Sequence, residues 1–352
     1  MPTAFMTGDI NLMNVDDPLV PFHRVRDWLA GADVRFSNLE CCLHLPEHGH
    51  TLEHEGFFAD PEIAAAALKE AGIDVVGIAN NVNYGEANIV GSMANLRRHQ
   101  IPFAGAGMNI AEARKPVIIE RAGVRYGFLQ RSSIYWSTNH EAGESGVGIA
   151  TIRGHTAYHV PMYREGSKTP PFNRPGIPPL IVTWADKDYL GRFADDIAKL
   201  RAEVDVLIAS CHWGLRGDVL EYMDDIARTA IDAGADVVMG HGPHQPLPVG
   251  IYKSKPIFYG LGSFSFHTGH LGTKAGDWLG LVVRMTGDGK GEPLRFSLRF
   301  VRHSDENETV LCDTTQEREA IDRLSAASQP HGATLSLLGE DIHIHPVEAA
   351  RS

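Results

Sequence analysis

The chain lacks the features of a membrane-spanning or secreted protein. None of its 352 residues belongs to a run of about 18 apolar residues, so we expect no helix that crosses a membrane. The first residues lead almost directly into an apolar strand, and no basic region followed by an apolar one precedes it, as a signal peptide would require. We therefore expect a cytoplasmic protein that has no membrane partner.

Cysteine is scarce and positive charge is not concentrated anywhere. The four cysteines, of which Cys41 and Cys42 are adjacent, suit neither a disulfide framework nor a CxxC zinc site, so a reduced compartment is expected. The formal net charge is −12 and no basic stripe offsets it, which argues against a nucleic-acid partner. The chain is long enough to bury a sizeable core.

What the chain does contain is an alternation of strand and helix patterns. Short apolar runs predict strands at residues 3–7, 33–36, 74–78, 124–129, 205–210 and 236–239. Apolar residues at helical spacing predict helices at residues 86–99, 187–203 and 221–233. Such alternation is typical of βαβ units, so we predict an α/β protein with a largely parallel sheet.

Two stretches interrupt this alternation. Residues 150–190 contain six prolines and predict a long irregular insertion, either a loop that covers the substrate or a passive surface excursion. Residues 256–266, 279–286 and 294–302 predict successive strands without helices, hence an antiparallel extension. A helix at 315–326 and a polar tail follow. We predict one domain over residues 1–305 and a C-terminal helix and tail over 306–352.

Residues of the types that commonly bind metals follow the predicted strands. They are Asp9, Asn38, Glu40, Asn81, His212, His241 and His244. In an open α/β sheet, ligands bind outside the carboxyl ends of the strands, so these side chains should converge on one edge. Carboxylate, carboxamide and imidazole groups suit a borderline-to-hard divalent metal. The sequence therefore predicts a metal site.

Each of these signals has a simpler explanation when it is taken alone. Asp9 could cap a helix or turn, and Asn81 could be an ordinary turn residue. Asp186 follows an apparent strand end and could cap the next helix, and Arg216 could form a surface salt bridge. The histidine-rich segment 44–54 could be a solvated loop or could contribute to binding. The coincidence of acids, amides and imidazoles at successive strand ends favours a site.

Together these segments resemble the CapA family of capsule and poly-γ-glutamate synthesis proteins, whose fold is that of the calcineurin-like metallophosphatases. The motifs are GD at 8–9, NLE at 38–40, AGIDVVGIANN at 71–81, AGAG and the following EA within 104–113, HWG at 212–214, DAGADVVMGHGPH at 232–244 and KPIFYGLGSFSF at 255–266. The resemblance covers roughly residues 3–267. It implies a sandwich of two mixed sheets flanked by helices.

The resemblance also implies a metal centre and its ligands. Asp9, Glu40, Asn81, His212 and His244 are the strongest ligand candidates, and Asn38 and Asn11 are expected beside them. The centre would hold one or two divalent ions of manganese, iron or zinc. Such ions polarise a phosphoryl or carbonyl group and lower the pKa of bound water. We expect a small-molecule or peptide-like substrate, and a homo-oligomer is possible.

Four positions depart from the family pattern. Val82 stands where the family has a histidine that is thought to assist the leaving group. Gly242 replaces the first histidine of the family's HPH turn, and His241 could substitute for it. Arg216 occupies the place of a common glutamate, and Ser263 the place of an asparagine. Either the site holds one ion and performs new chemistry, or the pocket works without metal.

The expected activity follows from these matches and departures. We predict a metal-dependent hydrolase that attacks an amide or ester carbonyl, with catalytic roles for His212, Arg216, His241 and Asp186. Arg131 and His267 are further candidates for recruited roles. An epimerase or isomerase acting by proton transfer α to a carbonyl is an alternative, because such a reaction has no leaving group to protonate. A phosphoesterase and an accessory protein of capsule or polymer synthesis are the others.

Overall fold

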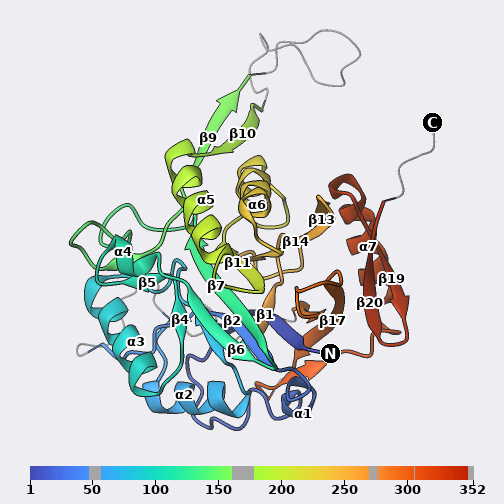
Figure 1. Ribbon diagram of the computed structural model, residues 1–352. Helices are drawn as coiled ribbons and strands as arrows, with labels where there is room; N and C mark the ends of the chain where they lie inside the picture. The colour runs from blue at the N-terminus through green and yellow to red at the C-terminus, as the bar shows by residue number, and fades with distance from the viewer. Residues whose placement is uncertain (47–56, 161–177, 269–275, 277, 305, 348–352) are drawn as a thin grey trace.

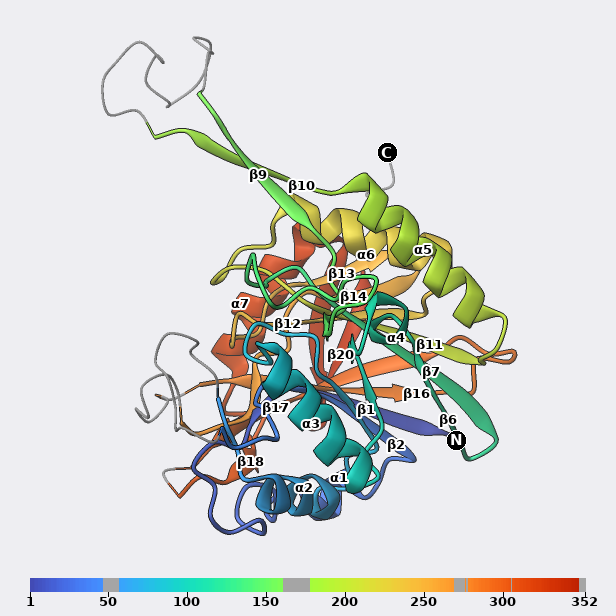
Figure 2. The ribbon, with the colours of Figure 1, turned by 90° about the vertical axis from the view of Figure 1, so that its left-hand side faces the viewer.

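Two β-sheets pack face to face, and helices cover the outer face of each (Figures 1 and 2). The computed structural model describes residues 1–46, 57–160, 178–268, 276, 278–304 and 306–347. Both sheets contain parallel and antiparallel pairs. The predicted α/β class is therefore confirmed, although the sheets are mixed rather than largely parallel.

The larger sheet has ten strands and carries the N-terminus. Its order is β19 (Ala333–Leu338), β20 (Asp341–Pro346), β17 (Arg295–His303), β16 (Gly280–Thr286), β1 (Thr3–Asn11), β2 (Val34–Leu39), β3 (Val75–Gly77) and β4 (Phe103–Ala104). Strand β15 (Ser263–Phe266) pairs with β1, and β18 (Thr309–Leu311) pairs with β17. The strands β1 to β4 run parallel, as the alternation predicted.

The smaller sheet has six strands. Its order is β13 (Val249–Tyr252), β14 (Lys255–Phe258), β12 (Val237–His241), β11 (Val206–His212), β7 (Val124–Ser132) and β6 (Val117–Arg121). The central strands β14, β12, β11 and β7 are parallel, so their carboxyl ends share one edge. Two short strands, β5 (Ala106–Gly107) and β8 (Gly148–Ile149), form a separate pair near α4 (Ile110–Ala113).

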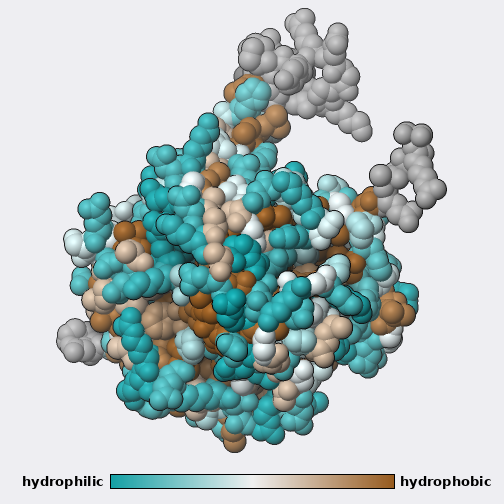
Figure 3. Space-filling view, in the orientation of Figure 1, coloured by the Kyte–Doolittle hydropathy of each residue, from teal (hydrophilic) through white to brown (hydrophobic). Residues whose placement is uncertain are grey.

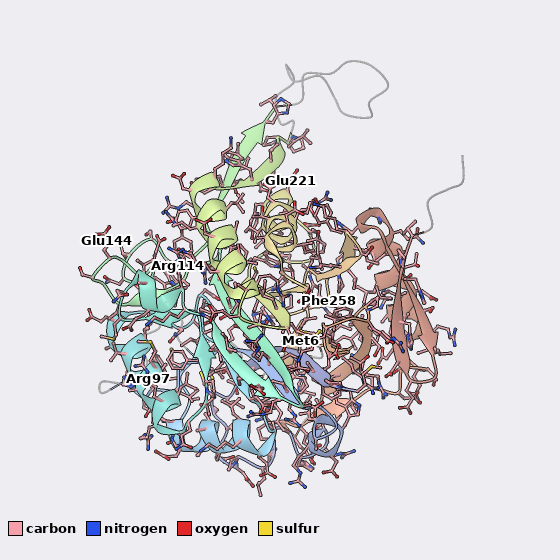
Figure 4. All side chains as sticks on the ribbon, in the orientation of Figure 1. Met6, Arg97, Arg114, Glu144, Glu221 and Phe258 are labelled. Atoms are coloured by element: carbon pink, nitrogen blue, oxygen red, sulfur yellow. The ribbon has the colours of Figure 1, made fainter. Side chains whose placement is uncertain are left out.

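Large apolar side chains fill the space between the sheets. The rings of Phe36 and Phe128 stack across it, with centroids 5.2 Å apart. Met6 and Phe258 lie in the same core, near the centre of Figure 4. Helices α1 (Arg26–Leu29), α2 (Pro61–Glu70) and α3 (Glu86–Arg98) cover the ten-stranded sheet, whereas α5 (Lys187–Arg201) and α6 (Glu221–Ala233) cover the six-stranded sheet. Burial on both faces of each sheet holds the strand ends in place.

The predicted strand at 256–266 is in fact two strands in different sheets. β14 runs parallel to β12 in the six-stranded sheet, and β15 runs parallel to β1 in the ten-stranded sheet. The chain crosses between the sheets at residues 259–262, where Gly262 has a φ of +70°, a conformation that glycine adopts at little cost. The expected antiparallel pairing among the predicted strands is therefore correct for β16 and β17 and wrong for β14 and β15, although β14 also pairs antiparallel with β13.

The C-terminal segment is more ordered than the predicted polar tail. Helix α7 spans Arg318–Ser328, close to the predicted 315–326, and the hairpin β19–β20 then joins the edge of the ten-stranded sheet through β17. Alternating apolar residues on either side of a turn at Gly339, which the prediction passed over, account for this hairpin. The domain boundary at residue 305 remains a prediction.

The proline-rich insertion begins and ends as a two-stranded antiparallel ribbon. Strands β9 (Gly154–His159) and β10 (Leu180–Ala185) pair along their length and project from the body (Figures 1 and 2). The expectation of an irregular segment is wrong for these strands, and residues 161–177 lie outside the described residues. Exposed apolar side chains, among them Tyr158 and Ile181, gather on the ribbon (Figure 3).

At its base the ribbon is held by α6. The backbone N–H groups of Thr183 and Ala185 donate to the carboxylates of Glu221 and Asp225, both at 3.1 Å. Figure 4 shows Glu221 at the start of α6, beneath the ribbon. In the described part of the chain, no helix is both long and apolar enough to span a membrane.

Candidate metal centre

The acidic side chains of the centre come from the ten-stranded sheet. Asp9 lies within β1 and Glu40 directly follows β2, and both are buried. The backbone N–H of Asp9 donates to the carbonyl oxygen of Gly262 at 2.9 Å. This close approach requires glycine at position 8, because a Cβ there would lie 2.0 Å from the same carbonyl oxygen. The GD motif thus places Asp9 against the turn before β15.

Asn38 fixes the orientation of Asp9. Its Nδ2 donates to Asp9 Oδ1 at 2.8 Å, while its Oδ1 accepts from Asn80 Nδ2 at 3.3 Å and from Gln130 Nε2 at 2.9 Å. Gln130 comes from β7 of the other sheet, and its Oε1 accepts from the backbone N–H of Ala79 at 2.7 Å. Both polar atoms of the Asn38 side-chain amide are engaged in these bonds, so Asn38 is held in place and in turn orients Asp9. Sequence reasoning missed Asn80 and Gln130.

The imidazoles come from the six-stranded sheet. His212 ends β11, His241 ends β12, and His244 follows three residues later. His241 Nδ1 lies 3.3 Å from Asp9 Oδ1, and His244 Nδ1 lies 3.1 Å from Asp9 Oδ2. His244 Nε2 and His212 Nε2 lie 3.6 and 3.9 Å from Glu40 Oε1. The structure thus brings these predicted residues together.

Gly242 shapes the turn between the last two histidines. Its φ of +114° is a conformation that side-chain-bearing residues rarely adopt, and a Cβ would lie 2.8 Å from the carbonyl oxygen of Trp213. Its backbone N–H donates to Asp9 Oδ2 at 3.3 Å. The family's histidine does not fit here without a change of backbone. His241 instead reaches Asp9 from the preceding position.

Several buried polar atoms of this cluster make no hydrogen bond within the part of the chain that the structure describes. They are Glu40 Oε2, His212 Nδ1 and His241 Nε2, whereas the Nδ1 atoms of His241 and His244 face Asp9 at 3.3 and 3.1 Å. Buried polar atoms are normally hydrogen-bonded, so such a concentration calls for a ligand. Candidate ligand atoms of Asp9, Glu40 and His244 all lie within 4.8 Å of one another. This donor set fits a divalent metal ion.

The two acids have opposite pKa shifts. Burial alone would raise the pKa of Asp9, but His241 and His244 outweigh it and hold this pKa well below its usual value. Burial, reinforced by the neighbouring charge of Asp9, raises the pKa of Glu40 well above its usual value. Two adjacent buried carboxylates are costly unless a cation is present. The region therefore favours positive charge.

The same buried charges shift the pKa values of two histidines. Burial lowers the pKa of His212 to about 3, although Asp9 opposes the shift. For His244, burial acts downward, but Glu40 and Asp9 raise the pKa to about 9. His212 Nε2 lies 2.8 Å from Asn81 Oδ1, which fixes the direction of the ring. A neutral, oriented imidazole such as His212 is the form that binds a metal.

Three predicted site residues have polar contacts outside the cluster. Both amide atoms of Asn11 are engaged, since Nδ2 donates to the carbonyl of Thr268 at 2.7 Å and Oδ1 accepts from the N–H of Met13 at 2.9 Å. Asp186 caps the N-terminus of α5, which confirms the helix-cap alternative, and its catalytic role stays a prediction. Arg131 is buried and pairs with the carboxylate of Asp196 at 2.5 Å.

The remaining candidates are Arg216, His267 and the histidine-rich segment 44–54. The side chain of Arg216 is exposed on the turn after β11, and no contact places it at the cluster. His267 follows Phe266, whose ring lies 4.6 Å from that of His244. In the histidine-rich segment 44–54, residues 47–54 lie outside the described residues. A contribution from this segment therefore stays a prediction.

His140 is a buried histidine that sequence reasoning missed. Its Nε2 lies 3.1 Å from the carbonyl oxygens of both Asn80 and Asn83, and its Nδ1 accepts from the N–H of Trp136 at 2.9 Å. It thus holds the loop that carries Val82. Burial lowers the pKa of His140 to about 4. His140 lies after β7 but away from any predicted strand end, so its place in the sequence did not indicate a role.

Comparison with known proteins agrees with the motifs. Residues 4–268 match the family described as "Bacterial capsule synthesis protein PGA_cap", and the chain belongs to this family. It is 24% identical over 277 residues to "PGA biosynthesis protein CapA" of Bacillus subtilis (strain 168), a match that covers 77% of this chain and 62% of the relative. The resemblance to CapA proteins is therefore confirmed.

Two further relatives carry related names. The chain is 28% identical over 285 residues to "Capsule biosynthesis protein CapA" of Bacillus anthracis, which covers 77% of this chain and 61% of that protein. It is also 28% identical over 197 residues to a "Probable polyglutamine synthesis accessory protein" of Mycobacterium tuberculosis, with 53% and 44% covered. The chain spans about three-fifths of the length of the two CapA relatives.

Proposed function

We propose that this protein is a metal-dependent hydrolase of amide or ester bonds, built on a metallophosphatase-like sandwich. The observation that carries the proposal is the buried cluster of carboxylates and imidazoles, in which several ligand atoms make no hydrogen bond within the described residues. Asp9, Glu40, His212, His241 and His244 would hold one or two ions of manganese, iron or zinc. A bound ion supplies Lewis acidity and lowers the pKa of water.

The surrounding residues orient and shield this centre. Asn38 and the N–H of Gly242 both donate to Asp9, which keeps its two oxygens directed at the histidines. Asp9, Glu40, His212 and His241 are almost fully buried, so little bulk water reaches them. The side chain of His244 is 39% exposed, which makes it the member of the cluster that a substrate can approach.

The choice of a carbonyl substrate rests on position 82. Val82 is buried and can neither donate a proton nor bind metal. By the family resemblance, a residue that assists a phosphoester leaving group is missing at this place. His140 lies behind the same loop, but its ring nitrogens are engaged by backbone groups. Amide or ester hydrolysis on a small or peptide-like substrate is therefore favoured over phosphoester hydrolysis.

The first test measures metal and activity on the same preparation. Elemental analysis of protein purified without chelator or affinity tag should find about one or two equivalents of manganese, iron or zinc per chain. A panel of chromogenic amides and esters should be hydrolysed, and a chromogenic phosphodiester should not. Substoichiometric metal that added salts do not restore would overturn the metal-centre proposal. Phosphodiester turnover faster than ester turnover would overturn the choice of substrate.

The names of the relatives favour a second candidate, an accessory role in polymer synthesis without catalysis. It would leave the metal bound but no amide or ester turned over. Proton transfer α to a carbonyl is separated from hydrolysis by solvent deuterium, which would enter recovered substrate only in the epimerase case.

A further inference from the structure

A groove of about 580 Å³ lies directly beside the candidate metal centre. One wall is the turn that carries His244 and continues to Pro248, and the other includes Trp278, Leu279 and helix α7. His244 belongs to both the groove and the metal centre. Because the other cluster residues are buried, a molecule lying in this groove would meet the centre at His244.

One stripe of α7 faces this groove. Its lining residues Ala320, Arg323, Leu324 and Ala327 follow an i, i+3, i+4, i+7 pattern, which places them on one side of the helix. The N–H of Val249 donates to the hydroxyl of Ser328 at 2.9 Å, and this bond ties the end of α7 to β13. The helix is thus a fixed wall.

Most of the lining residues are apolar, among them Trp278, Leu279 and Phe300, and the polar side chains are those of His244, Gln245 and Arg323. Polar atoms nevertheless make up nearly half of the surface that the groove exposes. Arg323 forms an ion pair with Glu319 one turn earlier, so its charge is already balanced. Ligand sites of this size are typically apolar, with a few polar groups that fix orientation. The lining therefore suits an apolar group that adjoins polar atoms, such as the side chain or acyl chain next to an amide or ester.

We propose that this groove binds an apolar side chain or acyl group of the substrate and so places the scissile amide or ester beside His244. The proposal rests on the hydrolase function proposed above and adds a substrate class. The family match ends at residue 268, whereas Trp278, Leu279, Phe300 and α7 lie beyond it. One wall of the groove therefore lies outside the matched segment, whereas the wall that carries His244 lies within it.

Binding tests this inference without depending on turnover. The probes are N-acetylphenylalanine methylamide and N-acetylglycine methylamide, titrated calorimetrically into chelator-treated and metal-loaded full-length protein. We expect the phenylalanine probe to bind at least tenfold more tightly than the glycine probe. Equal affinities would overturn the proposal. Since metal content is measured separately, a failed groove and a failed metal centre give different results.

Two adjacent alanines of α7 provide a matched pair of variants. Ala327→Trp fills the groove, whereas Ala326→Trp adds the same side chain at an exposed position that does not line it. Ala327→Trp should weaken binding of the phenylalanine probe at least tenfold and leave metal content unchanged. Ala326→Trp should behave as the wild type. Ala327→Glu, which places a charge in the groove at an exposed helix position, should weaken binding in the same way. Unchanged binding in both Ala327 variants would overturn the proposal.

Discussion

The two halves of the candidate metal centre come from different sheets and differ in how they are held. The acidic half, Asp9 and Glu40, extends from the ten-stranded sheet, and Asp9 is fixed by hydrogen bonds from Asn38 and Gly242. The imidazole half extends from β11, β12 and the turn after β12 in the six-stranded sheet. Within the described part of the chain, His212 Nδ1 and His241 Nε2 make no hydrogen bond, and the Nδ1 atoms of His241 and His244 face Asp9 at 3.3 and 3.1 Å.

This difference indicates a division of roles. A carboxylate that accepts hydrogen bonds is oriented before any ligand arrives, whereas a buried imidazole nitrogen without a partner gains most when a ligand binds. An ion bound between the two halves would also link the sheets, so metal removal should lower the thermal stability of the whole protein.

Removal of charge from the acidic half should have the largest effect. Asp9→Asn keeps the size of the side chain but removes the carboxylate that faces two histidines. We expect metal content to fall at least tenfold and hydrolysis to fall by about 10³-fold, because the ion loses an anionic ligand. Elemental analysis and the ester assay measure this. Asp16→Asn, at an exposed acid, is the control. Normal metal content in Asp9→Asn would contradict the assignment.

His140 should make the protein less stable in acid. In the unfolded chain its pKa returns to about 6.5, whereas burial in the folded protein lowers it to about 4. The unfolded state thus binds the proton first, so the free energy of unfolding should fall by about 3 kcal/mol as the pH drops from 6.5 to 4.

Urea unfolding between pH 7 and pH 4.5 measures this contribution. His140→Gln should flatten the pH dependence, and His159→Gln, at an exposed histidine, should leave it unchanged. Parallel curves for the wild type and His140→Gln would show that the loop is not held through a neutral imidazole.

The turn in the imidazole half should be intolerant of a side chain. Gly242→Ala combines a φ of +114° with a close contact to Trp213, and we expect a loss of about 2–3 kcal/mol in the free energy of unfolding. Gly123→Ala has a φ of +75° but open space around it, so it should cost only about 1 kcal/mol. Chemical denaturation of both separates strain from contact. Equal losses would mean that the contact with Trp213 is relieved.

The smallest effect is expected from the residue that orients the acid. Asn38→Ala removes the donor to Asp9 but no proposed ligand, so metal affinity should fall by about 10–100-fold. Competition with a coloured chelator gives this affinity. Asn88→Ala in α3 is the control, and an unchanged affinity in Asn38→Ala would place the positioning of Asp9 in other contacts.

The sequence was sufficient to predict the site residues that lie at the ends of parallel strands. Parallel strands share an edge, so His212 and His241 could be assigned to one edge from the apolar runs before them. Contacts between segments that are far apart in the sequence leave no comparable pattern of residues. Asn11 is engaged by Thr268, 257 positions away, and Gln130 reaches Asn38 across two sheets. The hydrogen-bonded frame around the site therefore required the structure, whereas its acids and imidazoles did not.

The base of the projecting ribbon also bears on aggregation. A strand as apolar as β10 would ordinarily offer its open edge to a strand of another molecule. Here the carboxylates of Glu221 and Asp225 already accept from the outward N–H groups of Thr183 and Ala185. A second chain could extend the ribbon at this point only by displacing α6. Two carboxylates therefore block the addition of a further strand at the base of a ribbon that exposes several large apolar side chains.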